Sequence, residues 1–320
     1  MNAQDPGPTT QDLSGVLVVD KPEGPTSHDV VTLTRRALGV SRVGHTGTLD
    51  PLATGVLPLV IGRATRLAQF LTSGDKHYEA TIAFGRRTDT YDVKGRELAV
   101  CDRRPARDDL EAALTRFRGT FEQTPPAYSA KNIDGERSYE LARRQKSDVR
   151  PKPVAVTVRR LELVSFNRER ATLDMTVSAG FYVRSLAHDL GELLGCGAVL
   201  LALRRTRSGE FDLASAVPLA AILASSREQL VDRVLPMSAV LKKLPAVALR
   251  ARSTLERLKN GVELGPDDFV APLPAVLGAL AAPEARRDVV VRLLTPEGDL
   301  AGLAKPGKEP GRLHGWIVLA

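Results

Sequence analysis

One carboxylate lies in the stretch GHTGTLDPLATGVLPL, residues 44–59, among glycine, threonine, proline and aliphatic residues. This carboxylate, Asp50, is the only acidic side chain between Asp29 and Asp75. The glycines on both sides of it allow sharp turns and a close approach of the backbone to a ligand. A carboxylate presented on a rigid loop of this kind can act as a nucleophile.

Two other interpretations of the stretch involve no catalysis by Asp50. An aspartate that precedes a proline commonly forms a turn, so Asp50 could serve only to turn the chain. The glycines and threonines could instead cradle a phosphate, but the stretch lacks the lysine of the GxxxxGK[ST] pattern and its carboxylate repels phosphate. The residue types therefore favour a catalytic or a turn-forming carboxylate over a nucleotide site.

Strands and helices alternate around this stretch, without an internal repeat. The apolar run at residues 15–19 predicts a buried strand, and Thr26 or Ser27 can cap the helix that follows. Residues 56–61 predict a second strand. Pro58 places this strand at a sheet edge or a bulge, because proline lacks an N–H group.

Two further segments carry candidate functional side chains. In residues 78–84 apolar and polar side chains alternate, as in a half-buried strand that begins with Tyr78. The sequence VRSLAHDLGELLG, residues 183–195, has its apolar residues on one helical face and a glycine at its end. Tyr182 and Arg184 therefore lie at the N-terminal end of this helix.

This order of elements predicts an α+β fold built on a mixed, largely antiparallel sheet. The length of 320 residues favours one large domain and one small domain. Near Val240 the pattern becomes short and glycine-punctuated, so we place a domain boundary there, between residues 13–240 and 241–320. Residues 1–12 are rich in polar residues and proline and predict a flexible tail.

The chain is basic, with a net charge of +7 and a sequence pI near 9.6. Its arginines recur in pairs, at Arg35 and Arg36, Arg86 and Arg87, Arg143 and Arg144, and Arg204 and Arg205. Such a surface attracts a polyanion and makes binding dependent on salt. Nucleic acid is the first candidate partner, although arginine pairs can also be solvated faces without a ligand.

The two cysteines, Cys101 and Cys196, are far apart and lack metal-ligand spacing, so the sequence predicts neither a disulfide framework nor a zinc site. No basic and apolar leader opens the chain, and no run of about 18 apolar residues occurs. We therefore expect a cytoplasmic protein without a membrane-spanning segment or a bound metal.

Residues 44–59 resemble the signature of the TruB family, the tRNA pseudouridine(55) synthases. The resemblance continues in the same order through GVLVVDKPEGPTSHDVV, DKHYEATIAFGRRTDTYDVKG, TPPAYSAKNIDGERSYELAR and FYVRSLAHDLGELLGCGAVLLALRR. It covers residues 15–211. It implies the pseudouridine synthase fold, with residues 13–240 as the catalytic domain and residues 241–320 as a small β-rich domain similar to the PUA-type RNA-binding domain.

The family isomerises uridine to pseudouridine at position 55 of tRNA, without a cofactor or a metal. By resemblance Asp50 is the catalytic carboxylate, which acts either covalently or by removing a proton from the ribose. Arg184 matches the arginine that pairs with this aspartate. Tyr78 matches the tyrosine that stacks on the target base and can serve in removing the C5 proton, although strand spacing alone is more typical of a core tyrosine.

Five further residues match contacts to the substrate. His45 matches the histidine that fills the space left by the flipped base. Tyr182 and Leu203 match residues beside that base. Lys21 matches a lysine near the active site that meets an RNA phosphate or supports the Asp50 loop, and Lys131 matches a residue that faces the RNA.

The partner that the resemblance implies is tRNA, contacted at its T-arm and elbow, with the C-terminal domain on the acceptor side. We expect a monomer that needs neither a membrane nor an obligate protein partner. A second hypothesis is a module that binds tRNA and helps it refold without turnover. The presence of Asp50, Tyr78 and Arg184 together favours the isomerase.

Overall fold

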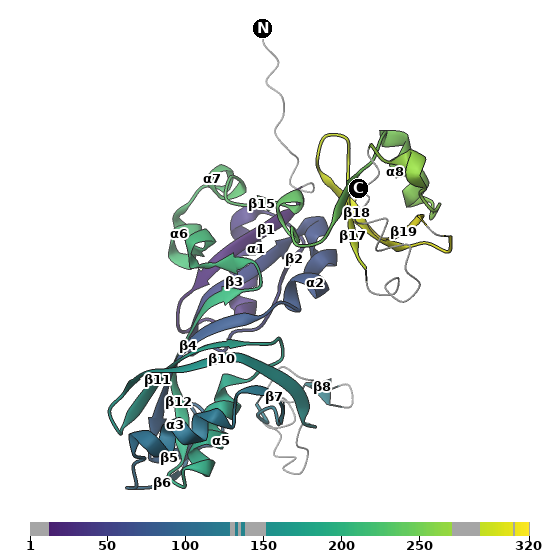
Figure 1. Cartoon of the computed structure of the whole chain (residues 1–320). Coiled ribbons are helices and arrows are strands. Elements are labelled where there is room, and N and C mark those ends of the chain that lie inside the picture. The colour runs from purple at the N-terminus through teal and green to yellow at the C-terminus, as the bar shows by residue number, and fades with distance from the viewer. Residues whose placement is uncertain are drawn as a thin grey trace.

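The structure is a computed structural model that describes residues 13–128, 132–133, 136–137, 152–270, 289–309 and 311–319. Eleven of the described strands form one mixed sheet (Figure 1). Its main path is β14 (Val217–Pro218), β1 (Gly15–Lys21), β3 (Ala53–Ile61), β12 (Ala198–Ser208), β4 (Lys76–Phe84), β11 (Arg170–Val177), β10 (Val154–Phe166) and β7 (Gly119–Gln123). Off this path lie β2 (Val43–His45), β13 (Phe211–Asp212) and β15 (Leu235–Pro236). Within this sheet β1 pairs with β14 and β3 with β12 in parallel, and the other described pairs are antiparallel, so the predicted α+β class with a largely antiparallel sheet is confirmed.

β1 is apolar over most of its length because both faces of the sheet are covered there. Leu17 and Val19 belong to one hydrophobic core, whereas Val16 and Val18 belong to a second core on the opposite face. Since side chains alternate between the two faces of a strand, an unbroken apolar run indicates burial on both sides. The run at residues 15–19 therefore forms the buried strand that the sequence predicts.

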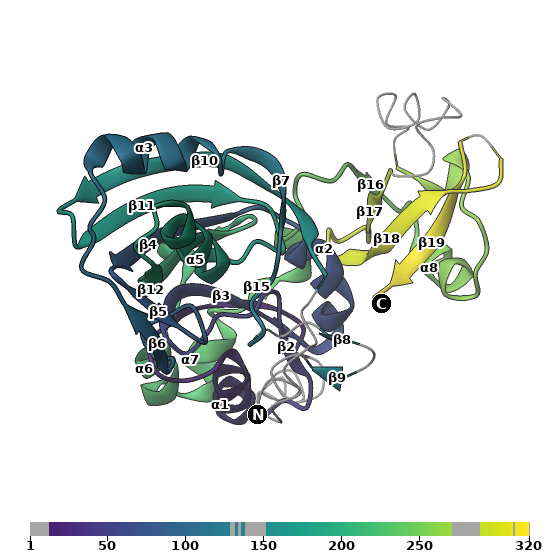
Figure 2. The same cartoon turned by 90° about the horizontal axis from the view of Figure 1, so that it is seen from below.

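Helices cover the first face of the sheet. The first core takes side chains from α1 (Ser27–Leu38), α3 (Arg107–Thr115), α5 (Val183–Leu193), α6 (Leu219–Ala224) and α7 (Arg227–Val231). Helix α5 packs on β12 and β4, and α3 packs on β10 and on α5 (Figure 2). The second face is covered by a 3-10 helix at Gly62–Leu67, by α2 (Ala68–Thr72) and by C-terminal strands. Within the described ranges, no helix has both the length and the apolar content to cross a membrane.

β3 is an interior strand, and its pairing with β1 passes through Pro58 without a register shift, so the prediction of a sheet edge or a bulge at Pro58 is wrong. Pro58 pairs with Val18 of β1 on one side, and β2 lies on the other side of β3. The Pro58 carbonyl faces β2 and accepts from the Thr46 N–H at 3.1 Å. The absent N–H points to this same side, where β2 ends at His45, so the ladder to β1 loses no hydrogen bond.

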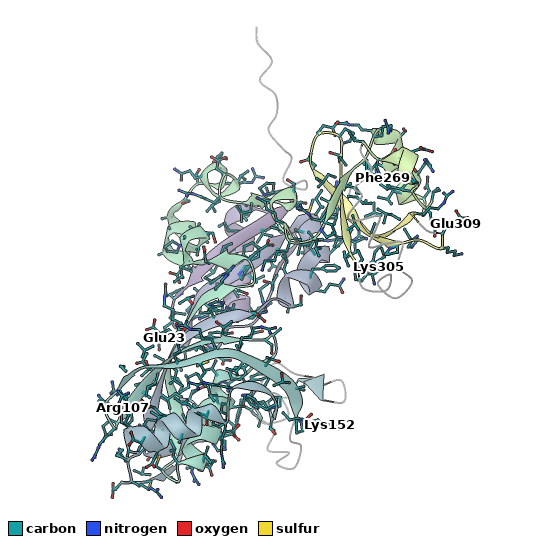
Figure 3. All side chains as sticks on the ribbon, in the orientation of Figure 1. Glu23, Arg107, Lys152, Phe269, Lys305 and Glu309 are labelled. Carbon is teal, nitrogen blue, oxygen red and sulfur yellow. The ribbon has the colours of Figure 1, made fainter. Side chains whose placement is uncertain are left out.

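The C-terminal residues form a second sheet with its own core. Its strand order is β16 (Ala246–Ala248), β17 (Val291–Leu294), β18 (Leu300–Pro306) and β19 (Leu313–Val318), and α8 (Arg252–Lys259) packs on β19. Phe269, only 1% exposed, lies within this module (Figure 3). Leu303 and Ile317 also join the core behind β1 and β3, and the ring of Trp316 meets that of Phe70 edge-on at a centroid distance of 5.0 Å. The second sheet therefore packs directly on the first.

Two ribbons of paired strands lie apart from the two sheets. β5 (Arg86–Thr88) pairs with β6 (Glu97–Val100), and β8 (Asn132–Ile133) pairs with β9 (Glu136–Arg137). The first ribbon encloses residues 89–96, of which Thr90 and Asp92 lie beside Arg184.

Candidate active site

Asp50 lies in the connection between β2 and β3, at a turn that the Ala53 N–H closes by donating to the Asp50 carbonyl at 3.0 Å. Gly47 and Gly55 have φ angles of 143° and 102°, in the region that favours glycine. A Cβ on Gly55 would lie 2.2 Å from the carbonyl oxygen of Arg205, so the start of β3, directly after the loop, packs closely against β12. The backbone thus makes the expected turn, while the Asp50 carboxylate finds its partner elsewhere.

Buried side chains hold the backbone of this loop. Ser27 Oγ accepts from the Leu49 N–H at 2.8 Å and donates to the Leu49 carbonyl at 2.9 Å. Lys21 Nζ donates to the Ala53 carbonyl at 2.7 Å and reaches the Pro51 carbonyl at 3.5 Å. Ser27 is 2% exposed and Lys21 is fully buried. Because the tethers are buried, the loop keeps one geometry before a substrate arrives.

Arg205 of β12 holds the first half of the loop. Its Nε donates to the Val56 carbonyl at 2.7 Å, and its Nη2 donates to the Gly47 carbonyl at 3.0 Å. Its Nη1 lies 3.4 Å from the Thr48 carbonyl. Arg205 is 1% exposed, and the acceptors of its donors are carbonyls of this loop and of β3.

Arg184 binds the carboxylate of Asp50 in a bidentate pair. Arg184 Nε donates to Asp50 Oδ2 at 2.8 Å, and Nη2 donates to Oδ1 at 3.3 Å. The remaining donors reach the carbonyls of Thr90 at 3.0 Å and Tyr128 at 2.8 Å, and the Asp92 carboxylate lies 3.9 Å from Nε. The Arg184 side chain is 7% exposed but that of Asp50 is 38% exposed, so the anchored guanidinium fixes a carboxylate that remains accessible.

Helix α5 begins at Val183, directly before Arg184, and its start is pinned by neighbouring chain. The Gln123 side chain accepts from the Tyr182 N–H at 2.8 Å and donates to the Tyr182 carbonyl at 3.0 Å. Ser185 Oγ donates to the Thr124 carbonyl at 2.8 Å. Arg184 therefore extends from the first turn of a helix whose position is set on both sides of it.

A cavity of about 230 Å³ opens beside the Asp50 and Arg184 pair. Tyr78, Tyr182 and Leu203 also line it, so five of the predicted site residues meet there. Tyr78 and Leu203 come from the adjacent strands β4 and β12, and each is 8% exposed. An aromatic ring and an apolar side chain beside an ion pair suit a flat, uncharged ring held next to a bond that is breaking.

Of the other three predicted residues, Lys21 and His45 are not part of the described cavity lining. The ammonium of Lys21 is buried against carbonyl oxygens, so of its two expected uses the structure shows the support of the Asp50 loop. His45 ends β2, and its Nδ1 accepts from the Gly47 N–H at 3.4 Å. Burial, together with Arg205, lowers the pKa of His45 below 6.5, so its ring is neutral at pH 7. Lys131 lies outside the described residues.

Buried cations lie near Asp50, which is the single carboxylate among the described residues that line the cavity. Burial lowers the pKa of Lys21 to about 8, and the Asp50 carboxylate opposes that shift. Burial and the nearby Arg205 lower the pKa of Lys76 to about 8 as well. Lys76 lines the cavity, and its ammonium donates to the Thr72 and Gly74 carbonyls. The excess of positive charge suits a polyanionic ligand.

Sequence reasoning missed Arg205, Ser27 and Gln123 as residues that build the site. For Arg205 a signal exists: it lies two residues after Leu203 in a strand, so the alternation that buries Leu203 also buries Arg205. Its neighbour Arg204 faces the other way and pairs with Asp20 at 2.9 Å, so this arginine pair does not form one basic surface. No local pattern distinguishes Gln123.

For Ser27, the ambiguity lay in the helix cap. Thr26 takes that position, because its hydroxyl accepts from the Asp29 N–H at 3.1 Å and the Asp29 carboxylate accepts from the Thr26 N–H at 2.9 Å. Ser27 is therefore left to bind Leu49.

Metal ligands were not expected from the sequence. Among the residues that the structure describes, no group of three or more His, Cys, Asp or Glu side chains could hold a metal ion. Cys101 is partly buried and Cys196 buried, and both are free thiols.

Comparison with known proteins matches the chain to one family. Residues 35–183 match the model described as TruB family pseudouridylate synthase (N terminal domain), and residues 184–242 match that of the tRNA pseudouridylate synthase B C-terminal domain. The tRNA pseudouridine synthase B of Solibacter usitatus is 46% identical over 259 residues, which are 80% of this chain and 88% of that protein. Its namesake from Symbiobacterium thermophilum is 47% identical over 255 residues, or 78% of this chain and 83% of that one.

Solved structures share the fold. A chain in the crystal structure of a Cbf5-Nop10-Gar1 complex aligns with a TM-score of 0.70 and 25% identity over 97% of this chain and 86% of that chain. A chain in an H/ACA RNP bound to a substrate RNA containing 2'-deoxyuridine aligns with a TM-score of 0.69, at 23% identity, over 97% and 86% of the two chains. With the Asp50 motif inside the matched residues, this chain belongs to the TruB family of pseudouridylate synthases.

Proposed function

We propose that this chain isomerises uridine to pseudouridine at position 55 in the T-loop of tRNA. The observation that carries the proposal is the bidentate pair of Asp50 and Arg184 beside a cavity that Tyr78 also lines. The relatives named tRNA pseudouridine synthase B, 46% and 47% identical over most of their length, support tRNA as the substrate. A net charge of +7 agrees with a polyanionic partner.

The target uridine must leave the stacked T-loop before it can enter the cavity. Taking a base out of its stack costs a few kcal/mol, which contacts elsewhere on the RNA must offset. We assign to His45 the filling of the space that the base leaves. Its neutral ring suits that use, because an uncharged imidazole can stack between bases with little desolvation cost.

The reaction is an isomerisation, so the nucleotide keeps its composition although one hydrogen is exchanged with water. The N1–C1′ bond breaks, the base turns while it remains in the cavity, and a C5–C1′ bond forms. The proton on C5 then leaves, and N1 takes up a proton, so no oxidant or reductant is needed. Asp50 either attacks C1′ and is later released, or removes a proton from the ribose. Tyr78 and Leu203 contact the base while it turns, and the Tyr78 hydroxyl is our candidate for removing the C5 proton.

Arg184 keeps the Asp50 carboxylate aligned in both routes. Two donors on one planar group set the orientation of the carboxylate as well as its position. The Lys21, Ser27 and Arg205 tethers hold the loop behind it, so little reorganisation is required during the reaction.

We also propose the parts of the chain that govern binding. Residues 13–240 act as the catalytic domain, and residues 241–320 act as a PUA-like module that grips the acceptor side of the tRNA. Tyr182 and Lys131 support the substrate nearer the cavity, whereas Lys21 holds the loop that carries Asp50. The separate core of the second sheet supports this division. The protein would work as a monomer in the cytoplasm, where its tRNA substrate is.

Tritium release tests the proposal. A tRNA transcript labelled with tritium at uridine C5 loses the label to water when pseudouridine forms, and mapping the product identifies the modified position. We expect release at position 55 by the wild type, and none by Asp50→Asn. The amide keeps the size of the carboxylate, so tRNA binding should stay within about threefold of the wild type.

Two outcomes would contradict the proposal. Release by Asp50→Asn at a rate near that of the wild type would remove Asp50 from its role. Tight binding without release by either protein would instead make the chain a tRNA-binding and refolding module, in which Asp50 only turns the chain.

A further inference from the structure

Two groups of the turn at residues 89–92 contact the guanidinium of Arg184. The Thr90 carbonyl accepts from Arg184 Nη1 at 3.0 Å, and the Asp92 carboxylate lies 3.9 Å from Nε. The Thr90 hydroxyl donates to Asp92 Oδ1 at 2.9 Å, which links the two groups. Any movement of this turn would therefore change the orientation of the guanidinium that aligns Asp50.

Tyr91, between these two residues, has a backbone conformation that L-residues rarely adopt. Its φ angle is 65°. Among the described non-glycine residues, only Arg168 and Leu241 also have a positive φ angle. A conformation of this kind persists only where the surroundings impose it. Here the Leu200 N–H donates to the Tyr91 carbonyl at 2.9 Å, and the Tyr91 ring is held by a second element.

That second element is the helix that carries Arg184. The Tyr91 ring stacks face to face on the ring of His188, with centroids 3.9 Å apart and an interplanar angle of 6°. His188 follows Arg184 by four residues in α5, so the two side chains lie on the same face, one helical turn apart. The turn thus contacts one helix face twice, through the Tyr91 ring and through the Thr90 carbonyl.

We propose that Tyr91 and His188 form a positioning pair for the reaction of the proposed function, on which this inference rests. Neither ring lines the cavity, so neither is placed to touch the base. Their stack holds the 89–92 turn against α5, and the turn then presents the Thr90 carbonyl and the Asp92 carboxylate to Arg184. The effect on chemistry passes through Arg184 to Asp50.

Variants that keep or remove the stack test this pair. Tyr91→Phe and His188→Phe keep two stacked rings, whereas Tyr91→Leu and His188→Leu lose one. With enzyme in excess over labelled tRNA, we expect the single-turnover rate constant to fall about tenfold in each Leu variant and less than about twofold in each Phe variant. The dissociation constant for tRNA should not change, because neither ring lines the site.

The double variant Tyr91→Leu/His188→Leu separates one shared contact from two independent ones. If the two rings act only through their stack, the double variant should be about as slow as either single Leu variant. A rate loss that multiplies in the double variant would overturn the pair as one device.

The folded fraction of each variant distinguishes a loss of stability from a loss of positioning. Thermal unfolding followed by circular dichroism gives that fraction for each variant at the assay temperature. A loss of rate that disappears when it is divided by the folded fraction, or equal rates in the Leu and Phe variants, would overturn the inference while the wild type still releases tritium. An inactive wild type would overturn the proposed function itself, and the inference with it.

Discussion

The surroundings of the Asp50 loop and the C-terminal module both contain basic side chains, but these lie in different environments. Lys21 is fully buried and Arg205 is 1% exposed, and both donate to backbone carbonyls of the loop or its flanks. In the C-terminal module the side chains of Arg252, Arg257 and Arg312 are 79%, 48% and 43% exposed and pair with nearby carboxylates.

This difference indicates two uses of the same charge. A buried cation with fixed acceptors gives up hydration and mobility, so it determines geometry. An exposed cation keeps its hydration and contributes mainly salt-dependent attraction. We therefore expect changes at the buried cations to alter the rate of the chemical step, and changes at the exposed ones to alter the affinity for tRNA.

Arg184→Lys should show the largest effect. One ammonium cannot donate to both oxygens of Asp50 and also to the Thr90 and Tyr128 carbonyls. We expect the single-turnover rate constant to fall at least about a hundredfold, with tRNA affinity nearly unchanged. The measurement is tritium release with enzyme in excess.

Arg107→Lys is the matched control for this change. Arg107 is 53% exposed, pairs with Glu111 on α3 and lies at the first residue of that helix (Figure 3). The same exchange there should leave the rate within about twofold of the wild type. If Arg184→Lys behaved like this control, the bidentate pair would not be what aligns Asp50.

Gly55→Ala tests how tightly the start of β3, directly after the Asp50 loop, packs on β12. A Cβ at Gly55 would lie 2.2 Å from the Arg205 carbonyl oxygen, and the φ angle of 102° adds strain. We expect the free energy of unfolding to fall by about 3 kcal/mol, measured by urea denaturation.

Gly24→Ala separates the two causes of this loss. Gly24 has a similar φ angle of 112°, but nothing lies within 4 Å of its added Cβ. It should therefore lose only the part due to the backbone angle, about 1 kcal/mol. Equal losses in the two variants would show that β12 does not restrict β3 at Gly55.

Much of the fold and of the candidate site could be predicted from the sequence, and what could not be predicted has a physical cause. Local patterns are enough for β1, α1, β4 and α5, because alternation, capping and helical spacing act over a few residues. They also place Arg184 at the start of α5. The ordered motifs then bring Asp50, Tyr78 and Leu203 into one hypothesis, and the structure brings them to one cavity.

The tethers of the loop could not be predicted in the same way. Arg205 reaches carbonyls about 150 residues earlier in the chain, and a bond to a carbonyl leaves no mark on the identity of the residue that provides it. Pro58 shows the converse: its missing donor is visible in the sequence, but whether that donor was needed depends on where β2 ends.

Lys21→Met should have an intermediate effect. Methionine fills a similar volume but leaves the Ala53 carbonyl without its donor at 2.7 Å. We expect the single-turnover rate constant to fall about tenfold because the loop that carries Asp50 loses a tether. Single-turnover tritium release provides the measurement.

The pH dependence of the free energy of unfolding tests whether Lys21→Met acts by removing a buried ammonium. Its pKa is about 8 in the folded chain against 10.5 for an ordinary lysine, so between these values the unfolded chain binds more protons. The free energy of unfolding gained from this group therefore rises with pH across that window. The wild type should gain stability relative to Lys21→Met on going from about pH 8 to pH 10, and a constant difference would contradict the buried ammonium.

Lys305→Gln should have the smallest effect, and this effect should be on the affinity for tRNA alone. The Lys305 ammonium lies 3.5 Å from the ring centroid of Trp316, which is 39% exposed, so the charge is held at the surface of the C-terminal module. If it meets a tRNA phosphate, its removal should weaken binding about threefold and reduce the salt slope by about one. Lys259→Gln in the same module should change that slope less, because Lys259 already pairs with Glu256 at 2.9 Å. Binding titrations at several salt concentrations measure both slopes, and a fall in the rate constant at saturating tRNA for Lys305→Gln would contradict the separation of buried cations for chemistry from exposed cations for affinity.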